Sequence, residues 1–169
     1  MTHAAYFEQF TKHLEKIDEL TLIVLKGHLI LEEGLERIIK LHVFNGQYIE
    51  DARFQFYKKV QIARSLALRK DKHGIWDLIL AINGLRNKLA HSLDVEVRKK
   101  KFEELKRIYK REVVGTNLKE VTTEDKDHEV VLYACALCAG FLGEYEADAK
   151  KFRRLIDVMD DTLNPKDMA

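Results

Sequence analysis

The chain has 169 residues, enough for one domain to bury most of its apolar surface without disulfides or a structural metal. Hydrophobic residues make up 46% of it and charged residues 34%, as in a soluble globular protein rich in exposed charge. The longest uncharged apolar run, from Val130 to Leu142, is shorter than the roughly 20 residues that a membrane span needs, and no signal peptide opens the chain. We therefore expect a cytoplasmic protein without a membrane segment.

Apolar residues recur at helical spacing through nearly the whole chain, and runs of strand-like alternation are absent. In chain order, this pattern predicts helices at about residues 4–19, 21–44, 50–69, 74–89, 95–112 and 124–160. Asn45-Gly46 ends the second helix, and Asp94 is placed to cap the fifth. A loop is expected at residues 113–127. The sequence therefore predicts an all-α, single-domain bundle of five to six helices that spans residues 1–169.

The predicted second helix is apolar on more than one side, which is typical of a helix at the centre of a bundle. Gly27 and Gly34 lie seven residues apart on one of its faces. Each costs roughly 1 kcal/mol of helix propensity relative to Ala. We expect the missing side chains to let another helix backbone approach closely.

Cys135 and Cys138 form a lone C-x-x-C in "YACALCAG". No second cysteine pair and no histidine pair at zinc-finger spacing accompanies them. We interpret them as small buried packing residues, and a redox pair is the alternative.

Charge is distributed unevenly along the chain. Residues 53–111 hold 17 Lys and Arg against 6 Asp and Glu, whereas the remainder holds 12 basic and 22 acidic residues. The basic excess has two interpretations: a solvated helix surface, or a surface that binds the phosphate backbone of a nucleic acid. A chain with one basic and one acidic region can also form a dimer by pairing the opposite patches of two copies. In the second interpretation, the residues predicted to contact nucleic acid are Lys88, Arg98, Lys99, Lys100 and Lys101, and the nucleic acid is RNA if the resemblance described below holds.

The stretch "INGLRNKLAHSLD" carries Arg86 and His91 where an apolar helix is expected to end. Spacing alone proves little, because Arg37 and His42 have the same separation. On a continuous helix such side chains point roughly 140° apart. We expect a helix end between Arg86 and His91 to redirect the imidazole toward the guanidinium.

Three consecutive parts of the sequence resemble the HEPN superfamily of helical bundles. They are "YKKVQIARSLAL", "IWDLILAINGLRNKLAHSLD" and the charged helix that follows. The signature of that superfamily is R-x-x-x-x-H, often with Asn directly after the Arg, and Arg86, Asn87 and His91 match it. Asn83 lies in the approach to the motif, and Asp94 is the acidic residue that follows the His. The resemblance covers about residues 20–112, and the predicted helix at 124–160 matches less clearly.

The resemblance implies an endoribonuclease that needs no metal or cofactor, often a toxin of toxin–antitoxin or antiviral systems. It also implies a homodimer whose two motifs line one cleft, with a protein antitoxin or a nucleotidyltransferase as a further partner. We expect the dimer interface to include residues 82–89. Other members of the superfamily have lost activity and act as binding or regulatory modules.

Metal-free RNA cleavage fits the chemistry of the three motif residues. His91 is a general acid or base near neutrality, and Arg86 donates two hydrogen bonds to phosphate oxygens. Asn87 is placed to bind a phosphate or to fix the histidine tautomer. In the alternative interpretation, Arg86 satisfies carbonyl groups at a helix end and His91 packs against the next helix.

Glu32 and Glu33 on the predicted second helix are candidate supporting acids, and we expect one of them to pair with an arginine of the motif. With His28 they have the spacing of metal ligands, but no third ligand is identifiable, so no metal is predicted.

Two functions follow. The first is an RNA-cleaving toxin or defence effector. The alternative is an inactive dimeric helical module that binds RNA, nucleotides or a protein partner, with transcriptional regulation as one such role.

Overall fold

The computed structural model describes residues 18–50, 52–91 and 94–164. Within these ranges the chain forms helices and no strand, so the predicted all-α bundle is confirmed. The helices are α2 (Glu19–His42), α3 (Gln47–Glu50), α4 (Phe56–Leu66), α5 (Ile75–His91), α6 (Val95–Glu112) and α7 (Asp127–Leu163). Residues 4–17 of the predicted first helix lie outside the described residues.

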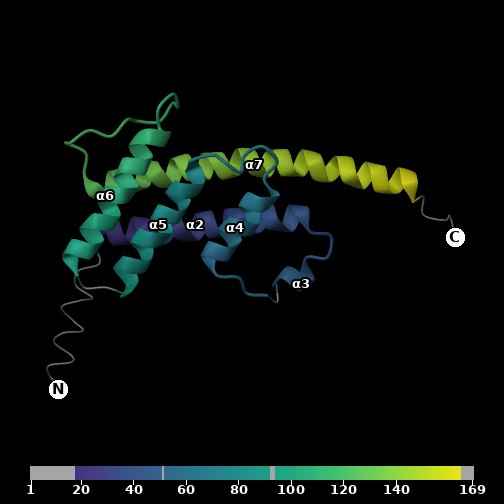
Figure 1. Cartoon of the computed structure of the whole chain (residues 1–169), viewed down its shortest axis with the longest axis horizontal. Coiled ribbons are helices and arrows are strands. Elements are labelled where there is room, and N and C mark those ends of the chain that lie inside the picture. Colours follow the sequence, from purple (N-terminus) through teal and green to yellow (C-terminus); the bar gives the residue numbers. More distant parts are fainter. Residues whose placement is uncertain (1–17, 51, 92–93, 165–169) are drawn as a thin grey trace, which may run out of the picture.

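Helices α2 and α7 lie side by side and run in the same direction (Figure 1). Gly27 faces Cys135, and one heptad further on Gly34 faces Leu142. A methyl group added at Gly27 would overlap Cys135 Sγ, and one at Gly34 would meet Leu142 Cδ1 at 3.3 Å. The two glycines therefore allow the predicted close approach, and the helix that approaches is α7.

Both cysteines of the C-x-x-C are free and buried in this contact. Burial raises the pKa of the Cys135 thiol to about 12 and also raises that of Cys138. A protonated, buried thiol is a packing group, because the thiolate is the reactive species. The packing interpretation of the pair therefore fits the structure.

Helices α4, α5 and α6 form a second layer that crosses the α2–α7 pair (Figure 1). Trp76 of α5 is fully buried, its Nε1 donates to Lys70 O at 2.8 Å, and its ring meets Phe141 of α7 edge-on. Tyr145 of α7 donates from its hydroxyl to Ala63 O of α4 at 2.9 Å. Trp76 and Tyr145 fix the second layer on α7, because each combines apolar burial with a satisfied polar group.

The single helix predicted at 50–69 is wrong, because the structure has α3 and α4 there. Arg53 adopts a left-handed backbone conformation, with φ of 44°, which a continuous helix does not allow. The chain turns at this point, and Phe56 at the start of α4 is buried against His28.

Other helix ends differ from the prediction by two or three residues. Helix α2 begins after Asp18, whose carboxylate accepts from Thr21 N at 2.7 Å, and ends at His42. Helix α7 begins at Asp127 because the Asp125 carboxylate accepts from Thr122 N at 2.7 Å and holds the preceding residues in a turn. Asp94 caps α6, as predicted.

Among the described helices, only α7 is long and apolar enough by composition to cross a membrane. This is weak evidence, because the core helix of a soluble protein passes the same test, and 39% of the apolar window of α7 is buried in the bundle.

Candidate functional site

A groove of about 510 Å³ opens between α2, α4 and α5. We call it the Arg86 groove. It is lined by His28, Glu32, Gln55, Phe56, Tyr57, Asn83, Arg86, Asn87 and His91. The structure thus brings the three motif residues together with one of the two candidate glutamates. Glu33 is exposed and does not line the groove.

The predicted helix end between Arg86 and His91 is wrong. Helix α5 continues without a break through His91, since no glycine or proline interrupts it after Gly84. The two side chains nevertheless line the same groove. Side chains roughly 140° apart on a helix flank a face centred between them, and Asn83 and Asn87 lie on that face. Convergence therefore comes from the groove that faces α5 and needs no bend in the backbone.

The second Arg and His pair with the same spacing does not share a groove. Arg37 donates from Nε to Glu146 Oε2 at 3.0 Å. His42 lies in a different hollow, beside Tyr145. Spacing on a continuous helix is the same for both pairs, so the neighbouring helices distinguish the site from the chance match.

His28 of α2 is the only buried polar or charged residue among those described, with 7% of its surface exposed. Its ring stacks on Phe56 with centroids 4.1 Å apart, and its Nε2 donates to Asn83 Oδ1 at 3.0 Å. That bond places the proton on Nε2 and leaves Nδ1 as an acceptor. Glu32 Oε2 lies 3.9 Å from Nδ1.

Burial lowers the pKa of His28. The hydrogen bond to Asn83 and the charge of Glu32 act in the opposite direction, whereas the charges of Arg86 and Lys59 lower the pKa further. His28 is therefore neutral at pH 7, and the nearby guanidinium of Arg86 helps to keep it so.

Arg86 and Asn87 are neighbours in the groove as well as in the sequence. Arg86 Nη1 donates to Asn87 Oδ1 at 3.1 Å, and the Arg86 side chain is partly buried. Asn87 therefore orients the guanidinium. The tautomer-fixing amide of the site is Asn83, and the histidine that it fixes is His28.

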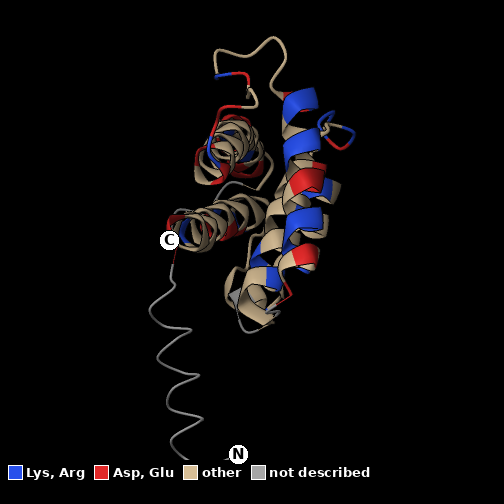
Figure 2. Ribbon diagram, turned by 90° about the vertical axis from the view of Figure 1, so that its left-hand side faces the viewer, with Lys and Arg blue, Asp and Glu red and all other residues tan. Residues whose placement is uncertain are grey.

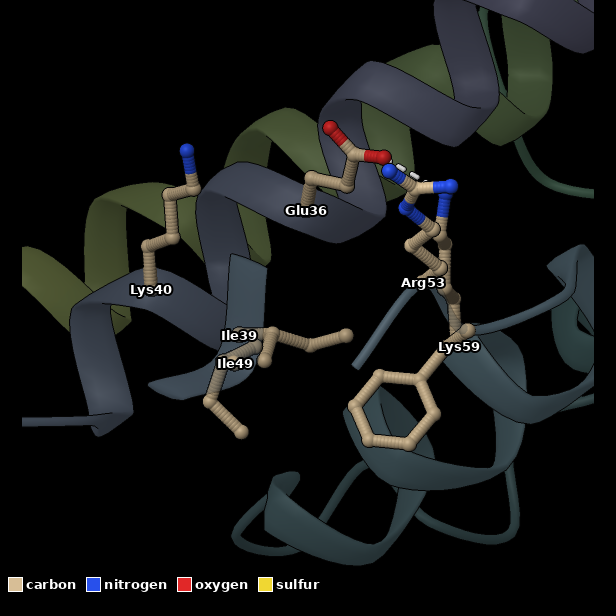
Figure 3. A pocket seen from close by; sticks show the side chains of 7 residues that line it. Glu36, Ile39, Lys40, Ile49, Arg53 and Lys59 are labelled. Atoms are coloured by element: carbon tan, nitrogen blue, oxygen red, sulfur yellow. Dashed lines mark hydrogen bonds and ion pairs between the residues drawn. The ribbon is translucent and has the colours of Figure 1, made fainter. Parts of the chain in front are cut away.

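Glu32 pairs with a lysine, so the predicted pairing with a motif arginine is wrong. Lys59 Nζ of α4 donates to Glu32 Oε1 at 2.6 Å and to Glu36 Oε1 at 2.5 Å. Figure 3 shows the Glu36–Lys59 pair at the edge of a neighbouring hollow that Arg53 also lines. Burial lowers the pKa of Lys59, but its bonds to the two carboxylates outweigh burial and leave the pKa raised. The shared lysine holds Glu32 at the rim of the Arg86 groove.

The residues predicted to contact RNA lie outside the groove. Lys88 is exposed on α5, and Lys99 and Lys100 are exposed on α6. Arg98 is partly buried, and Lys101 donates to Glu104 Oε2 at 2.6 Å in a hollow on another face of α5. Figure 2 shows that Lys and Arg follow α6 along its length, with acidic residues between them. The basic residues therefore form a surface beside the groove and leave its lining to Arg86.

Within the described ranges, no group of three or more His, Cys, Asp or Glu is placed to hold a metal ion. His28 and Glu32 are near each other, but the Glu32 carboxylate is already engaged by Lys59. No residue set in this part of the chain therefore indicates a metal centre.

Sequence reasoning missed the role of His28 and the contribution of α4 to the site. His28 drew attention as a weak metal ligand, and Asn83 as a flank of the motif, yet the two residues are 55 positions apart and bind each other. Gln55 and Phe56 belong to no motif, and Tyr57 begins the segment "YKKVQIARSLAL", which did not indicate that it lines the site. Only the buried position of a histidine on an apolar helix could have indicated His28.

Neither a family model, nor a curated protein, nor a solved structure matches this chain. The Arg86 groove and the motif that it contains are therefore the features of this protein that indicate a function.

Proposed function

We propose that this protein is a metal-independent endoribonuclease of HEPN type, which cleaves RNA by attack of the 2′-OH on the adjacent phosphate. The observation that carries the proposal is that one groove of a single chain holds Arg86, His91 and a second imidazole, His28. The motif resemblance supplies the reaction type, and the groove supplies the groups that this reaction needs.

In this reaction the 2′-oxygen forms a bond to phosphorus while the bond to the 5′-oxygen breaks. The proton of the 2′-OH passes to a base, and an acid protonates the departing 5′-oxygen. Neutral His28, with Nδ1 as an acceptor, takes the proton. His91 is exposed in the groove and donates the other proton. Arg86 stays cationic and stabilises the phosphorane through its planar pair of donors.

Two imidazoles in one chain change the role expected of a dimer. An interface at residues 82–89 was expected because a second imidazole was needed and because apolar residues surround the motif. His28 now supplies that imidazole, and Ile82 and Leu85 are buried in the core of their own chain. We therefore propose that each protomer of a homodimer carries a complete site.

The proposal is tested with purified protein and RNA in excess EDTA. Wild type should yield products with a 2′,3′-cyclic phosphate or its hydrolysed form and should leave DNA and a 2′-deoxy cut site intact. Arg86→Ala and His91→Ala should each lose about 10² or more of rate. Arg37→Ala and His42→Ala are matched controls with the same spacing outside the groove, and they should retain activity.

A strict need for magnesium, or full activity of His91→Ala, overturns the ribonuclease proposal. RNA that is bound in an Arg86-dependent way but never cut would instead identify the inactive binding module.

The biological role follows from the activity. As a cytoplasmic toxin or defence effector, the wild-type protein should arrest growth when expressed, and His91→Ala should not. A protein antitoxin or a nucleotidyltransferase should relieve the arrest. Harmless expression of active wild-type enzyme would contradict the toxin role.

A further inference from the structure

Helix α7 extends beyond the bundle that it helps to form. Its partner α2 ends at His42, and the last contact in register joins Arg153 Nη1 to Val43 O at 3.1 Å. About 15 Å of α7 follows Arg153, and Figure 1 shows this end of the helix projecting past all the other helices. We call residues 150–163 the α7 tip.

The apolar face of α7 continues along the tip, where none of the described helices covers it. Cys138, Leu142, Tyr145 and Ala149 are buried and follow one another at steps of four, three and four residues. The same alternation of steps leads to Phe152, Ile156, Met159 and Leu163. Phe152 is 50% exposed, Met159 52% and Leu163 72%. This heptad spacing is the pattern with which one helix packs against another along its length.

The charges of the tip are separated along the helix. Lys150, Lys151, Arg153 and Arg154 precede Asp157, Asp160 and Asp161. On the helix, Arg153 and Asp160 lie beside the apolar face, whereas Lys150, Arg154 and Asp161 lie on the opposite side. An antiparallel copy places Arg153 of each tip beside Asp160 of the other.

An apolar hollow lies at the base of the tip. It measures about 520 Å³, and Leu66, Leu68, Phe152 and Leu155 contribute its apolar walls. In an antiparallel pair, the end of each tip lies over the base of the other, so Leu163 of the second copy reaches this hollow. The apolar face, the charge order and the hollow all indicate the same occupant.

We propose that the α7 tip is a self-association surface, on which a second copy of this chain packs its own tip in antiparallel orientation. The interface is separate from α5 and from the Arg86 groove, so the proposal does not depend on ribonuclease activity. It gives the protein a dimer in which the two grooves remain open.

Sedimentation equilibrium of the full chain tests the proposal. Wild type should dimerise at micromolar concentration, and Met159→Glu should weaken the dimer at least tenfold. Leu132→Glu is the matched control, because Leu132 is also on α7 and is 51% exposed, but it lies far from the tip. Circular dichroism should show that both variants keep the helical content of wild type.

Charge reversal and cross-linking test the orientation. Asp160→Arg should weaken the dimer, and Arg153→Asp in the same chain should restore it. Mixed Arg153→Cys and Asp160→Cys proteins should form a disulfide with each other, and the two native cysteines are buried and do not interfere. A monomeric wild type at 100 μM, a dimer that Met159→Glu leaves unchanged, or efficient self-linking of Thr162→Cys overturns the proposal. Capture of an unrelated helix by a monomeric protein would do the same.

Discussion

The contact between Gly27 of α2 and Cys135 of α7 makes a quantitative prediction about packing. A Cβ atom at position 27 would overlap Cys135 Sγ and would lie 3.3 Å from Cys135 Cβ. Cys135 is itself buried, so its side chain has little room to move away. Gly27→Ala should therefore force α2 and α7 apart.

Two opposing terms decide the magnitude. Overpacking of a core contact costs about 1–3 kcal/mol. Replacing a helical glycine by alanine gains up to about 1 kcal/mol of propensity. The net effect of Gly27→Ala should be a loss of up to about 2 kcal/mol in the free energy of unfolding. Gly143→Ala, at a position in α7 with no atom within 4 Å of the added Cβ, should show only the gain.

Urea denaturation followed by circular dichroism measures these differences. Adding Cys135→Ala removes the overlapping sulfur, so the double variant should be at least about 1 kcal/mol more stable than the sum of the two single changes predicts. If Gly27→Ala stabilises the protein as much as Gly143→Ala does, the proposed close packing of α2 on α7 is refuted.

Three further predictions concern the cap of α6 and the Arg86 groove. Asp94→Ala should lower the free energy of unfolding by about 1 kcal/mol in urea, because Asp94 accepts from Glu96 N and Val97 N. The pKa of His28 is lower in the folded state than its ordinary value of 6.5, so the unfolded state binds more protons. The free energy of unfolding should therefore fall as the pH drops from 6.5 through the lower, folded-state pKa. Thermal denaturation at a series of pH values should show this fall for wild type and a smaller one for His28→Gln. Mixing inactive His28→Ala and His91→Ala proteins under conditions of subunit exchange should restore no RNA cleavage, and recovered activity would show instead that the site is shared between protomers.

Local sequence signals predicted most of the helices because each depends on residues close together in the chain. Helical periodicity predicted α5 and α6, and the Asp94 cap was correct to the residue. The pattern could not reveal the break before α4, since the left-handed Arg53 has no glycine or proline to indicate it. Helix α5 continues past Leu89 to His91 for a similar reason, because no glycine or proline follows Leu89 to stop it.

Local sequence signals likewise predicted only part of the candidate site. The motif gave Arg86, Asn87 and His91, which do share a groove. The expected bend in α5 was wrong, because Arg86 and His91 meet without it. The other wall of the groove comes from α2 and α4, and only tertiary packing places these helices opposite α5. The bond between His28 and Asn83 joins residues 55 positions apart, so no local pattern contains it.

The parallel arrangement of α2 and α7 has a consequence for how the chain acquires its structure during synthesis. Contacts in their interface join residues 109 and 110 positions apart, so α2 cannot meet its main partner until α7 has left the ribosome. His28 belongs to α2, and the helix that carries it has its buried face against α7. A nascent chain that ends before Asp127 should therefore lack an ordered Arg86 groove, which hydrogen exchange on a 1–126 fragment would measure. In a ribonuclease, this order of synthesis would keep the site inactive until α7 has been translated and has packed on α2.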